Sequence, residues 1–147
     1  MRFSNSVVIR RTPADVYNFL ANPDNIPRWN HAIGSARTTI PGPLTAGSWL
    51  ELSRAIPRPG VDRLEVTEVE PYRRLVLRGD VGPLHGTLDY VLQAVPEGTR
   101  LTNAADLQAS GLAGIFEAVV SKQVRSAVQD NLEVLRSLVE DAPLSSR

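Results

Sequence analysis

Cysteine is absent from the 147 residues of this chain. A chain without thiols forms neither disulfides nor thiolate metal sites, and disulfides are the clearest mark of small secreted domains. Residues 1–6 also lack the apolar segment that a secretory signal peptide needs. We therefore expect a cytoplasmic protein.

An excess of charge of either sign is absent as well. Lys plus Arg and Asp plus Glu number 16 each. A nucleic-acid-binding protein normally carries a basic excess. Acidic and basic residues alternate between Glu51 and Asp80, which predicts a solvated sheet face. No apolar run approaches the roughly 18 residues of a membrane span. We expect neither a nucleic-acid partner nor stable membrane insertion.

Recognisable catalytic and cofactor motifs are missing. The chain has no glycine-rich phosphate loop and no Gly-x-Ser-x-Gly sequence. Its two histidines, His31 and His85, are far apart and have no compact carboxylate motif beside them. Metal sites need several such ligands together. The sequence therefore predicts no metal and no cofactor.

Hydrophobic residues make up 42% of the chain, and no repeat or linker divides it, so residues 1–147 are expected to form a single domain. Alternating segments separated by Pro- and Gly-containing turns predict antiparallel strands. A capped, proline-initiated segment and a second short segment predict two short helices. The expected strands are 3–10, one beginning near 33, 48–56, 61–69, 74–78, 86–95 and 99–107, and the short helices are 12–20 and 25–29.

A long helix is predicted from about Gly111 to Glu140, because apolar residues recur there at helical spacing. A helix with one wide apolar stripe needs a partner surface, and the sheet supplies it. The predicted fold is α+β. A curved antiparallel sheet of about seven strands wraps around the C-terminal helix, with two short helices after the first strand and an apolar cavity between sheet and helix.

Three segments resemble those of a known family. They are Val7-Val8-Ile9-Arg10-Arg11-Thr12-Pro13-Ala14-Asp15-Val16-Tyr17, Asn22-Pro23-Asp24-Asn25-Ile26-Pro27-Arg28-Trp29, and Gly98-Thr99-Arg100-Leu101-Thr102 before a long helix. The family that they resemble is the START-like superfamily (SRPBCC). The resemblance covers almost the whole chain and is strongest to the polyketide cyclase/dehydrase and lipid transport branch. It implies a helix-grip fold and does not by itself identify the chemistry.

Three functions are compatible with this fold. The first is binding of a small apolar molecule that is lipid-like, quinone-like or polyketide-like, which the sparse polar residues favour. The second is a cofactor-free polyketide cyclase or dehydratase that positions such a molecule and moves protons. The third is a non-catalytic interaction protein that uses its exposed sheet. Exposed strand edges would also allow a homodimer.

The candidate ligand site follows from strand alternation and helix periodicity. Tyr90 shares a face with Leu88 and Leu92, and Asn103 lies among apolar neighbours, so both are expected on the concave face, where a phenol or amide needs a partner. The candidate ligand-binding residues are Trp49, Leu64, Leu77, His85, Leu88, Tyr90, Asn103, Phe116, Val120, Gln123 and Val124.

An enzyme would draw its acid or base from a small set. The candidates are His85, Tyr90 and Glu117. An imidazole titrates near neutral pH, and a carboxylate at the edge of an apolar helix face can have a raised pKa. A histidine at a turn is more often partly in water, and a carboxylate at a rim usually stays solvated.

Overall fold

The computed structural model describes residues 1–56, 58–109 and 117–143, with only the backbone of residues 117–120. The elements in chain order are β1 (Arg2–Ile9), α1 (Pro13–Leu20), the 3-10 helix η1 (Pro23–Asn25), α2 (Ile26–Trp29), β2 (Ile33–Thr38), β3 (Trp49–Arg54), β4 (Gly60–Glu70), β5 (Arg74–Val81), β6 (Leu84–Val95), β7 (Gly98–Ala109) and α3 (Glu117–Asp141).

The short helices begin where the sequence predicts. The Thr12 hydroxyl accepts a hydrogen bond from the backbone N–H of Asp15 at 3.2 Å, and Pro13 occupies the first helical position. Between α1 and α2 the chain forms η1, which is capped by the Asn22 side chain through a 3.0 Å bond from the N–H of Asp24. A 3-10 turn satisfies backbone groups that a simple loop would leave to water.

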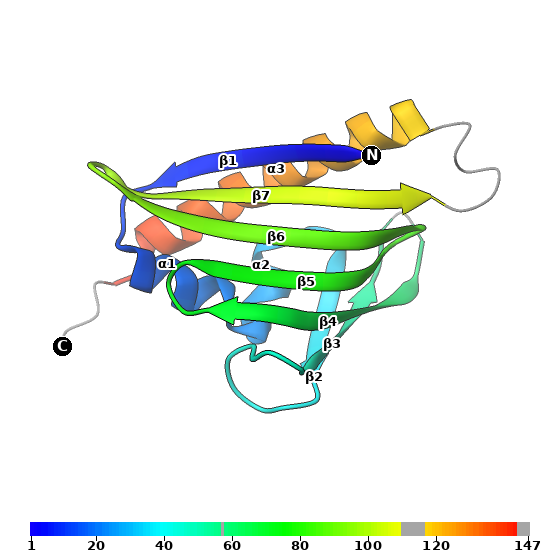
Figure 1. Ribbon diagram of the computed structural model, residues 1–147, viewed down its shortest axis with the longest axis horizontal. Helices are drawn as coiled ribbons and strands as arrows, with labels where there is room; N and C mark the ends of the chain where they lie inside the picture. The colour runs from blue at the N-terminus through cyan, green and yellow to red at the C-terminus, as the bar shows by residue number, and fades with distance from the viewer. Residues whose placement is uncertain (57, 110–116, 144–147) are drawn as a thin grey trace.

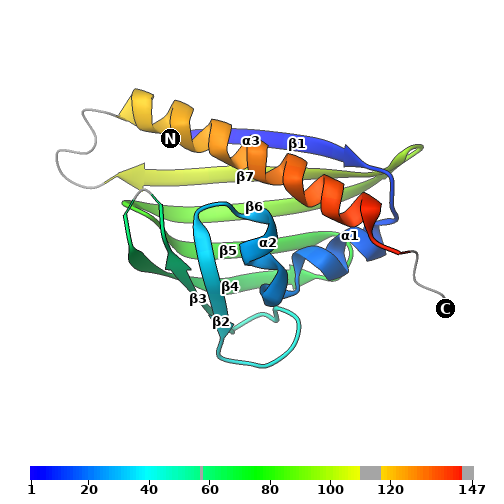
Figure 2. The same cartoon turned by 180° about the vertical axis from the view of Figure 1, so that it is seen from behind.

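Seven strands form one antiparallel sheet in the order β1-β7-β6-β5-β4-β3-β2 (Figure 1). Only β1 is out of sequence order, because the chain crosses from β1 through the short helices to the far edge. The view from behind shows α3 running across β1 and β7, while α1 and α2 lie against the same face of the sheet (Figure 2). The helices therefore share one face of the sheet.

Two paired glycines shape the bend of the sheet. Gly79 on β5 lies opposite Gly86 on β6, and their φ values are +152° and +157°. A Cβ atom at Gly79 would lie 2.1 Å from the Arg63 carbonyl oxygen, and one at Gly86 would lie 2.0 Å from that of Asp106. Only glycine tolerates this backbone and this approach.

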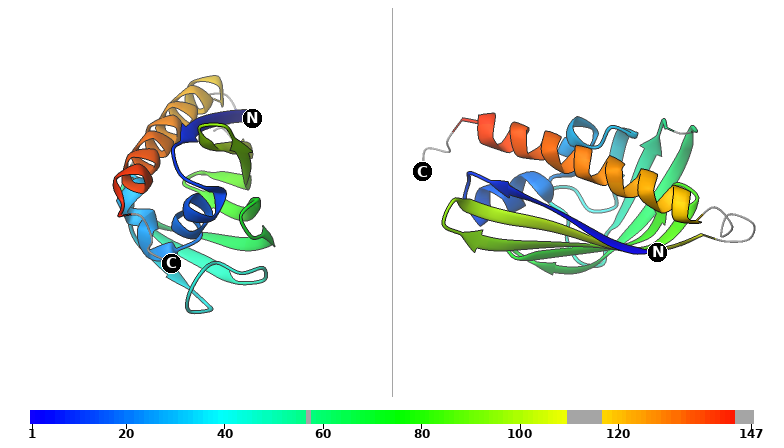
Figure 3. Two further views of the ribbon diagram at one scale, coloured as in Figure 1. Left: turned by 90° about the vertical axis from the view of Figure 1, so that its left-hand side faces the viewer. Right: turned by 90° about the horizontal axis from the view of Figure 1, so that it is seen from above.

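The core fills the concave side of the sheet. Seen end-on, the sheet curls and α3 lies across its open side (Figure 3). Leu132, Leu135 and Val139 of α3 are 1%, 0% and 3% exposed and belong to a cluster that includes residues from the sheet and both short helices. Ala127, expected on the apolar stripe, is exposed. The buried stripe is narrower than the sequence pattern because the sheet contacts only one side of the helix.

These elements confirm the predicted fold class, a curved seven-stranded antiparallel sheet with a long C-terminal helix. The observed α3 begins at Glu117, and the predicted helical residues before it lie outside the described part of the chain. Within the described residues, no helix has the length and apolar character to cross a bilayer.

Candidate functional site

One row of residues crosses the middle of the concave face. Strand pairing aligns Asn5 of β1 with Asn103 of β7, and Asn103 with Tyr90 of β6. Asn103 is 1% exposed and Tyr90 is 7% exposed, so the sequence placed both on the correct face. The row continues into Leu75 of β5, which is 1% exposed. Three polar side chains thus lie side by side in an otherwise apolar interior.

Asn103 is the residue in this row without a partner. Neither its amide nitrogen nor its amide oxygen forms a hydrogen bond. Its neighbour Asn5 differs, because the Asn5 amide nitrogen donates to the backbone oxygen of Arg125 on α3 at 3.2 Å. Leaving a buried polar group unpaired costs about 1–3 kcal/mol. Asn103 therefore presents two donors and an acceptor that the described protein does not use.

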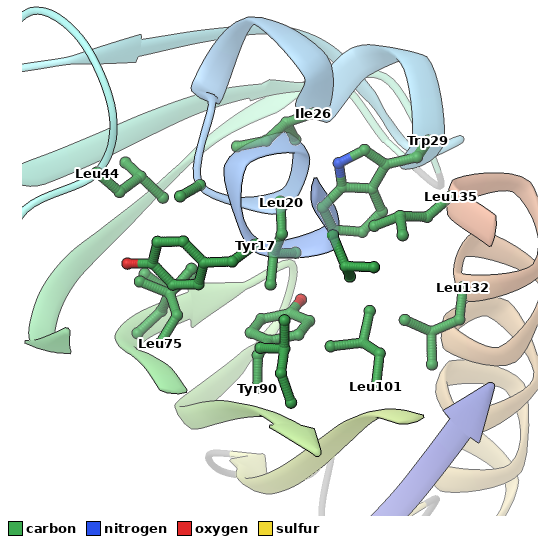
Figure 4. Packing of buried hydrophobic residues seen from close by; sticks show 14 of the residues in the cluster. Tyr17, Leu20, Ile26, Trp29, Leu44, Leu75, Tyr90, Leu101, Leu132 and Leu135 are labelled. Carbon is green, nitrogen blue, oxygen red and sulfur yellow. The ribbon is translucent and has the colours of Figure 1, made fainter. Parts of the chain in front are cut away.

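Tyr90 adds a second polar group beside Asn103. Its hydroxyl makes no hydrogen bond with any described residue. Figure 4 shows the ring rising from the sheet with the hydroxyl directed away from it, close to Leu101 and below α1. Burial raises the pKa of Tyr90, because an ionised phenolate would lose its hydration. The phenol is therefore neutral near pH 7 and acts as a proton donor in a hydrogen bond.

Trp29 contributes another buried donor, from α2. Its side chain is 6% exposed, and the indole N–H has no partner among the described residues. Trp29 lies beside Leu135 in the cluster, which fits its expected packing under the short helices (Figure 4). The indole ring packs in the core, and its N–H is a further buried donor without a hydrogen-bond partner among the described residues.

Partly buried apolar side chains lie beside this row. The buried core divides into two clusters, and Leu88 and Val128 are partly buried residues that contact both. Leu88 is on a central strand and lies between Leu77 and Ala105 in register. Leu88 of the sheet and Val128 of α3 therefore offer apolar surface near Asn103.

Most other candidate residues also share this interior. Leu64 and Leu77 are buried, and Val124 packs against the second cluster. Their role in contacting a ligand stays a prediction. Phe116 lies outside the described residues, as do the side chains of Glu117 and Val120.

Three candidates lie away from the interior, which corrects their expected placement. Trp49 is 46% exposed, because Leu50 takes the inward position on β3. His85 faces outward beside Leu84, and its Nδ1 lies 3.1 Å from the Asp80 carboxylate. Gln123 is exposed, because the adjacent Val124 turns toward the sheet.

Of the three catalytic candidates, only Tyr90 has a described side chain in the interior. No group of His, Asp and Glu side chains among the described residues has the geometry of a metal site. Among the described residues of the row, the polar groups available are a neutral phenol and two amides, none of which is a base.

The outer surface holds two clefts of different character. A cleft of 420 Å³ on the outside of β2, β3 and β4 is lined by Arg37, Thr38, Thr39, Trp49, Leu50, Glu51 and Arg63. A cleft of 260 Å³ between α1 and the end of α3 is lined by Arg11, Asp15, Asn18, Phe19, Asn25, Val139, Ala142 and Pro143. In the first, Glu51 bridges both arginines, at 2.5 Å and 3.3 Å. The hydrogen bond from Arg37 lowers the pKa of Glu51. One carboxylate between two arginines leaves one positive charge in excess in this cleft. Neither cleft contains the unpaired buried atoms found in the interior.

Asp62 is a buried carboxylate that the sequence pattern misses. The alternation of charges predicts a solvated position, yet Asp62 is 4% exposed. Its carboxylate accepts from Arg54 at 3.2 Å and from the backbone N–H of Gly82 at 3.1 Å. It thus joins the β3–β4 hairpin to the β5–β6 turn. Strand alternation is the local signal of its burial, because Asp62 shares one face of β4 with the buried Leu64 and Val66.

Comparison with known proteins agrees with this architecture. Residues 1–140 match the family described as "Polyketide cyclase / dehydrase and lipid transport". The chain belongs to this family. An uncharacterized protein of Mycobacterium tuberculosis, Rv2574, is 33% identical over 108 residues, which cover 68% of this chain and 61% of the relative. The chain thus spans less than two-thirds of the length of that curated relative, and an uncharacterized protein of Mycobacterium bovis, Mb2604, matches equally.

Solved structures show the same fold at low sequence identity. Protein MLL2253 of Mesorhizobium loti superimposes with a TM-score of 0.76 at 18% identity and covers 98% of this chain and 100% of its own. Ara h 8.0201 gives 0.78 at 13% identity, with 97% and 99% covered. The di-domain ARO/CYC protein StfQ from the steffimycin biosynthetic pathway gives 0.76 at 13% identity, with 95% and 50% covered. These similarities establish the helix-grip fold of this polyketide cyclase/dehydrase family member.

Proposed function

We propose that this protein binds a small hydrophobic molecule between the concave face of the sheet and α3. The observation that carries the proposal is the Asn103 amide, which is 1% exposed and has no hydrogen-bond partner on either atom. Buried polar groups are nearly always paired. A bound molecule that reaches Asn103 would supply the partner that the described residues do not.

The surroundings of Asn103 support an apolar ligand. The floor is formed by Leu77 and Leu88, and Val124 and Val128 of α3 lie above the second core cluster. Leu88 and Val128 stay partly buried between the clusters. Ligand sites are typically apolar clefts with a few placed polar groups. Membership of a polyketide cyclase and lipid transport family supports the same ligand class.

Titration with the neutral fluorescent probe N-phenyl-1-naphthylamine tests this proposal. We expect saturable binding to the purified protein, with Leu88→Trp weakening it by about tenfold, equivalent to 1.4 kcal/mol, because the larger side chain occupies the space beside Asn103. Val91→Trp is the matched control, since Val91 is on the same strand, faces outward and is 40% exposed.

The result separates binding in the interior from binding elsewhere. Equal weakening by both tryptophan variants would point to an outer surface and contradict the proposal. The absence of saturable binding in a folded protein, checked by cooperative unfolding, would also contradict it. Extraction and mass spectrometry of the freshly purified protein should recover an apolar molecule.

A cyclase or dehydratase is the second candidate, and Tyr90 is the observation that favours it. Tyr90 is 7% exposed, its hydroxyl makes no hydrogen bond with a described residue, and it is paired in register with the unpaired Asn103. A held phenol can donate a hydrogen bond to a carbonyl oxygen as it becomes more negative. In that case Tyr90→Phe would abolish turnover of a poly-β-keto substrate while leaving its binding almost unchanged. Loss of binding and turnover together would favour the carrier function.

A further inference from the structure

The interior site contains the neutral polar groups of Asn103 and Tyr90 and no described charge. This combination indicates which kind of ligand head group the site accepts. This inference rests on the proposed binding function and makes it more specific. Asn103 offers both donors and an acceptor, while Tyr90 next to it offers a neutral hydroxyl. A ligand group that only accepts, or only donates, would leave part of this pair unmatched.

Charge complementarity is missing from the described interior. The buried polar side chains of the described residues are Asn5, Ser48, Asp62, Thr99 and Asn103, and only Asp62 carries a charge. Asp62 is the one buried carboxylate among the described residues, and it is already bound to Arg54 and to the Gly82 N–H. A charged ligand head beside Asn103 would lose its hydration without meeting an opposite charge, which is unfavourable.

Asn5 does not change this balance. Although it is the neighbour of Asn103 in register, its amide nitrogen is engaged with the Arg125 backbone oxygen of α3. The polar contact with the helix is thus made at the β1 edge. The unpaired Asn103 amide lies one strand further in, on β7, next to β6 with the partly buried Leu88.

We propose that this site selects an apolar molecule with an uncharged head that both donates and accepts hydrogen bonds, such as an alcohol or a hydroxyketone. The head lies against Asn103 and the Tyr90 hydroxyl. The apolar body lies along Leu77 and Leu88 under Val128. Carboxylates of the same size are rejected because the site has no cation for them.

Displacement of N-phenyl-1-naphthylamine by three molecules of equal chain length tests the selection. These are 1-decanol, decyl methyl ether, which only accepts, and decanoate at about pH 8, where the carboxylate is ionised. We expect 1-decanol to bind about tenfold more tightly than decanoate and about fivefold more tightly than the ether, in line with one lost hydrogen bond.

Two variants test whether Asn103 and Tyr90 cause the selection. In Asn103→Leu the affinities for 1-decanol and the ether should differ by no more than about twofold, because the amide donors and acceptor are both lost. Tyr90→Phe should reduce the same difference, and it provides a second reading if Asn103→Leu does not fold. Gln93→Leu is the control, because Gln93 is exposed on the outer face of β6 and should leave the ratio unchanged.

The outcomes distinguish this inference from the function on which it rests. If decanoate binds as tightly as 1-decanol, or if the ether equals the alcohol in the unsubstituted protein, the head-group inference is wrong while apolar binding stands. If the probe binds but the ratio survives in both variants, the selection lies elsewhere and the assignment to Asn103 and Tyr90 is wrong. If neither the probe nor any of the three molecules binds, the proposed function itself fails.

Discussion

At the scale of single residues, Tyr90 and Asn103 form an inner pair without hydrogen bonds, whereas the other buried polar side chains of the strands, those of Asn5, Asp62 and Thr99, are bonded. On the outer face several charges are paired, as in the contact of Arg74 with Asp89 at 2.7 Å. Asp89 also raises the pKa of Arg74, because the carboxylate favours the charged guanidinium. The inner pair, by contrast, is neutral and unmatched. A stable protein that retains unmatched buried groups usually does so at a functional site.

Ionisation of Tyr90 should make the free energy of unfolding depend on pH in the alkaline range. Its pKa is raised in the folded protein, so the folded state holds the phenolic proton longer than the unfolded chain does. The stabilisation is complete below the unfolded pKa of about 10 and is lost as pH rises above it. The free energy of unfolding, measured in urea, should therefore decrease between about pH 10 and pH 11.5. In Tyr90→Phe this decrease should be smaller, by up to about 1.4 kcal/mol per pH unit. An unchanged slope would show that Tyr90 is hydrated in the folded state.

At the scale of elements, strand alternation predicts which residues share a face but not which strands bend. β5 and β6 bend where Gly79 and Gly86 face each other, and both have backbone torsions that favour glycine. The sequence presents these positions as ordinary strand glycines. Their close approach to neighbouring backbone becomes visible only when the strands are paired, because the contacting carbonyl oxygens belong to β4 and β7.

Substitution of Gly86 tests whether the bend is required. Gly86→Ala should reduce the free energy of unfolding by about 2–4 kcal/mol, because its Cβ would meet backbone that cannot move independently. Gly34→Ala is the control, since its nearest contact would be an ordinary 3.7 Å. Chemical denaturation of both variants measures the difference. Similar losses would show that the sheet accommodates the added methyl group at Gly86.

At the scale of the whole molecule, the C-terminal end of α3 is tied to the segment that follows β1. The Arg11 side chain donates to the backbone oxygens of Glu140 and Ala142, and the backbone N–H of Arg10 donates to the Glu140 carboxylate at 2.9 Å. These contacts anchor the C-terminal end of α3 beside α1. The anchored half carries the fully buried Leu132 and Leu135, whereas Val124 and Val128 are only partly buried against the second cluster. Burial of α3 is thus greater near its C-terminal end.

Shortening a buried side chain of α3 should therefore lower the free energy of unfolding of the protein. Leu135→Ala is expected to reduce the free energy of unfolding by about 2–5 kcal/mol, since Leu135 is fully buried. Val134→Ala, one residue away and 44% exposed, should change it by less than about 0.5 kcal/mol. Thermal or urea unfolding compares the two. Equal effects would mean that α3 is not held by this face.

Periodicity in the sequence was sufficient to predict the order of elements, the antiparallel sheet, the long helix and the inward direction of Tyr90 and Asn103. It was less informative for Trp49, because Trp49 and Leu50 are both apolar and a period of two does not say which of them faces inward. It was also insufficient for Asp62, whose burial depends on Arg54 and on a turn twenty residues away. Alternation and helical spacing are local properties of a chain, so the sequence by itself determined them. Only the tertiary structure decided which polar groups stay unpaired and which side chains are buried, since both depend on contacts between residues far apart in the chain.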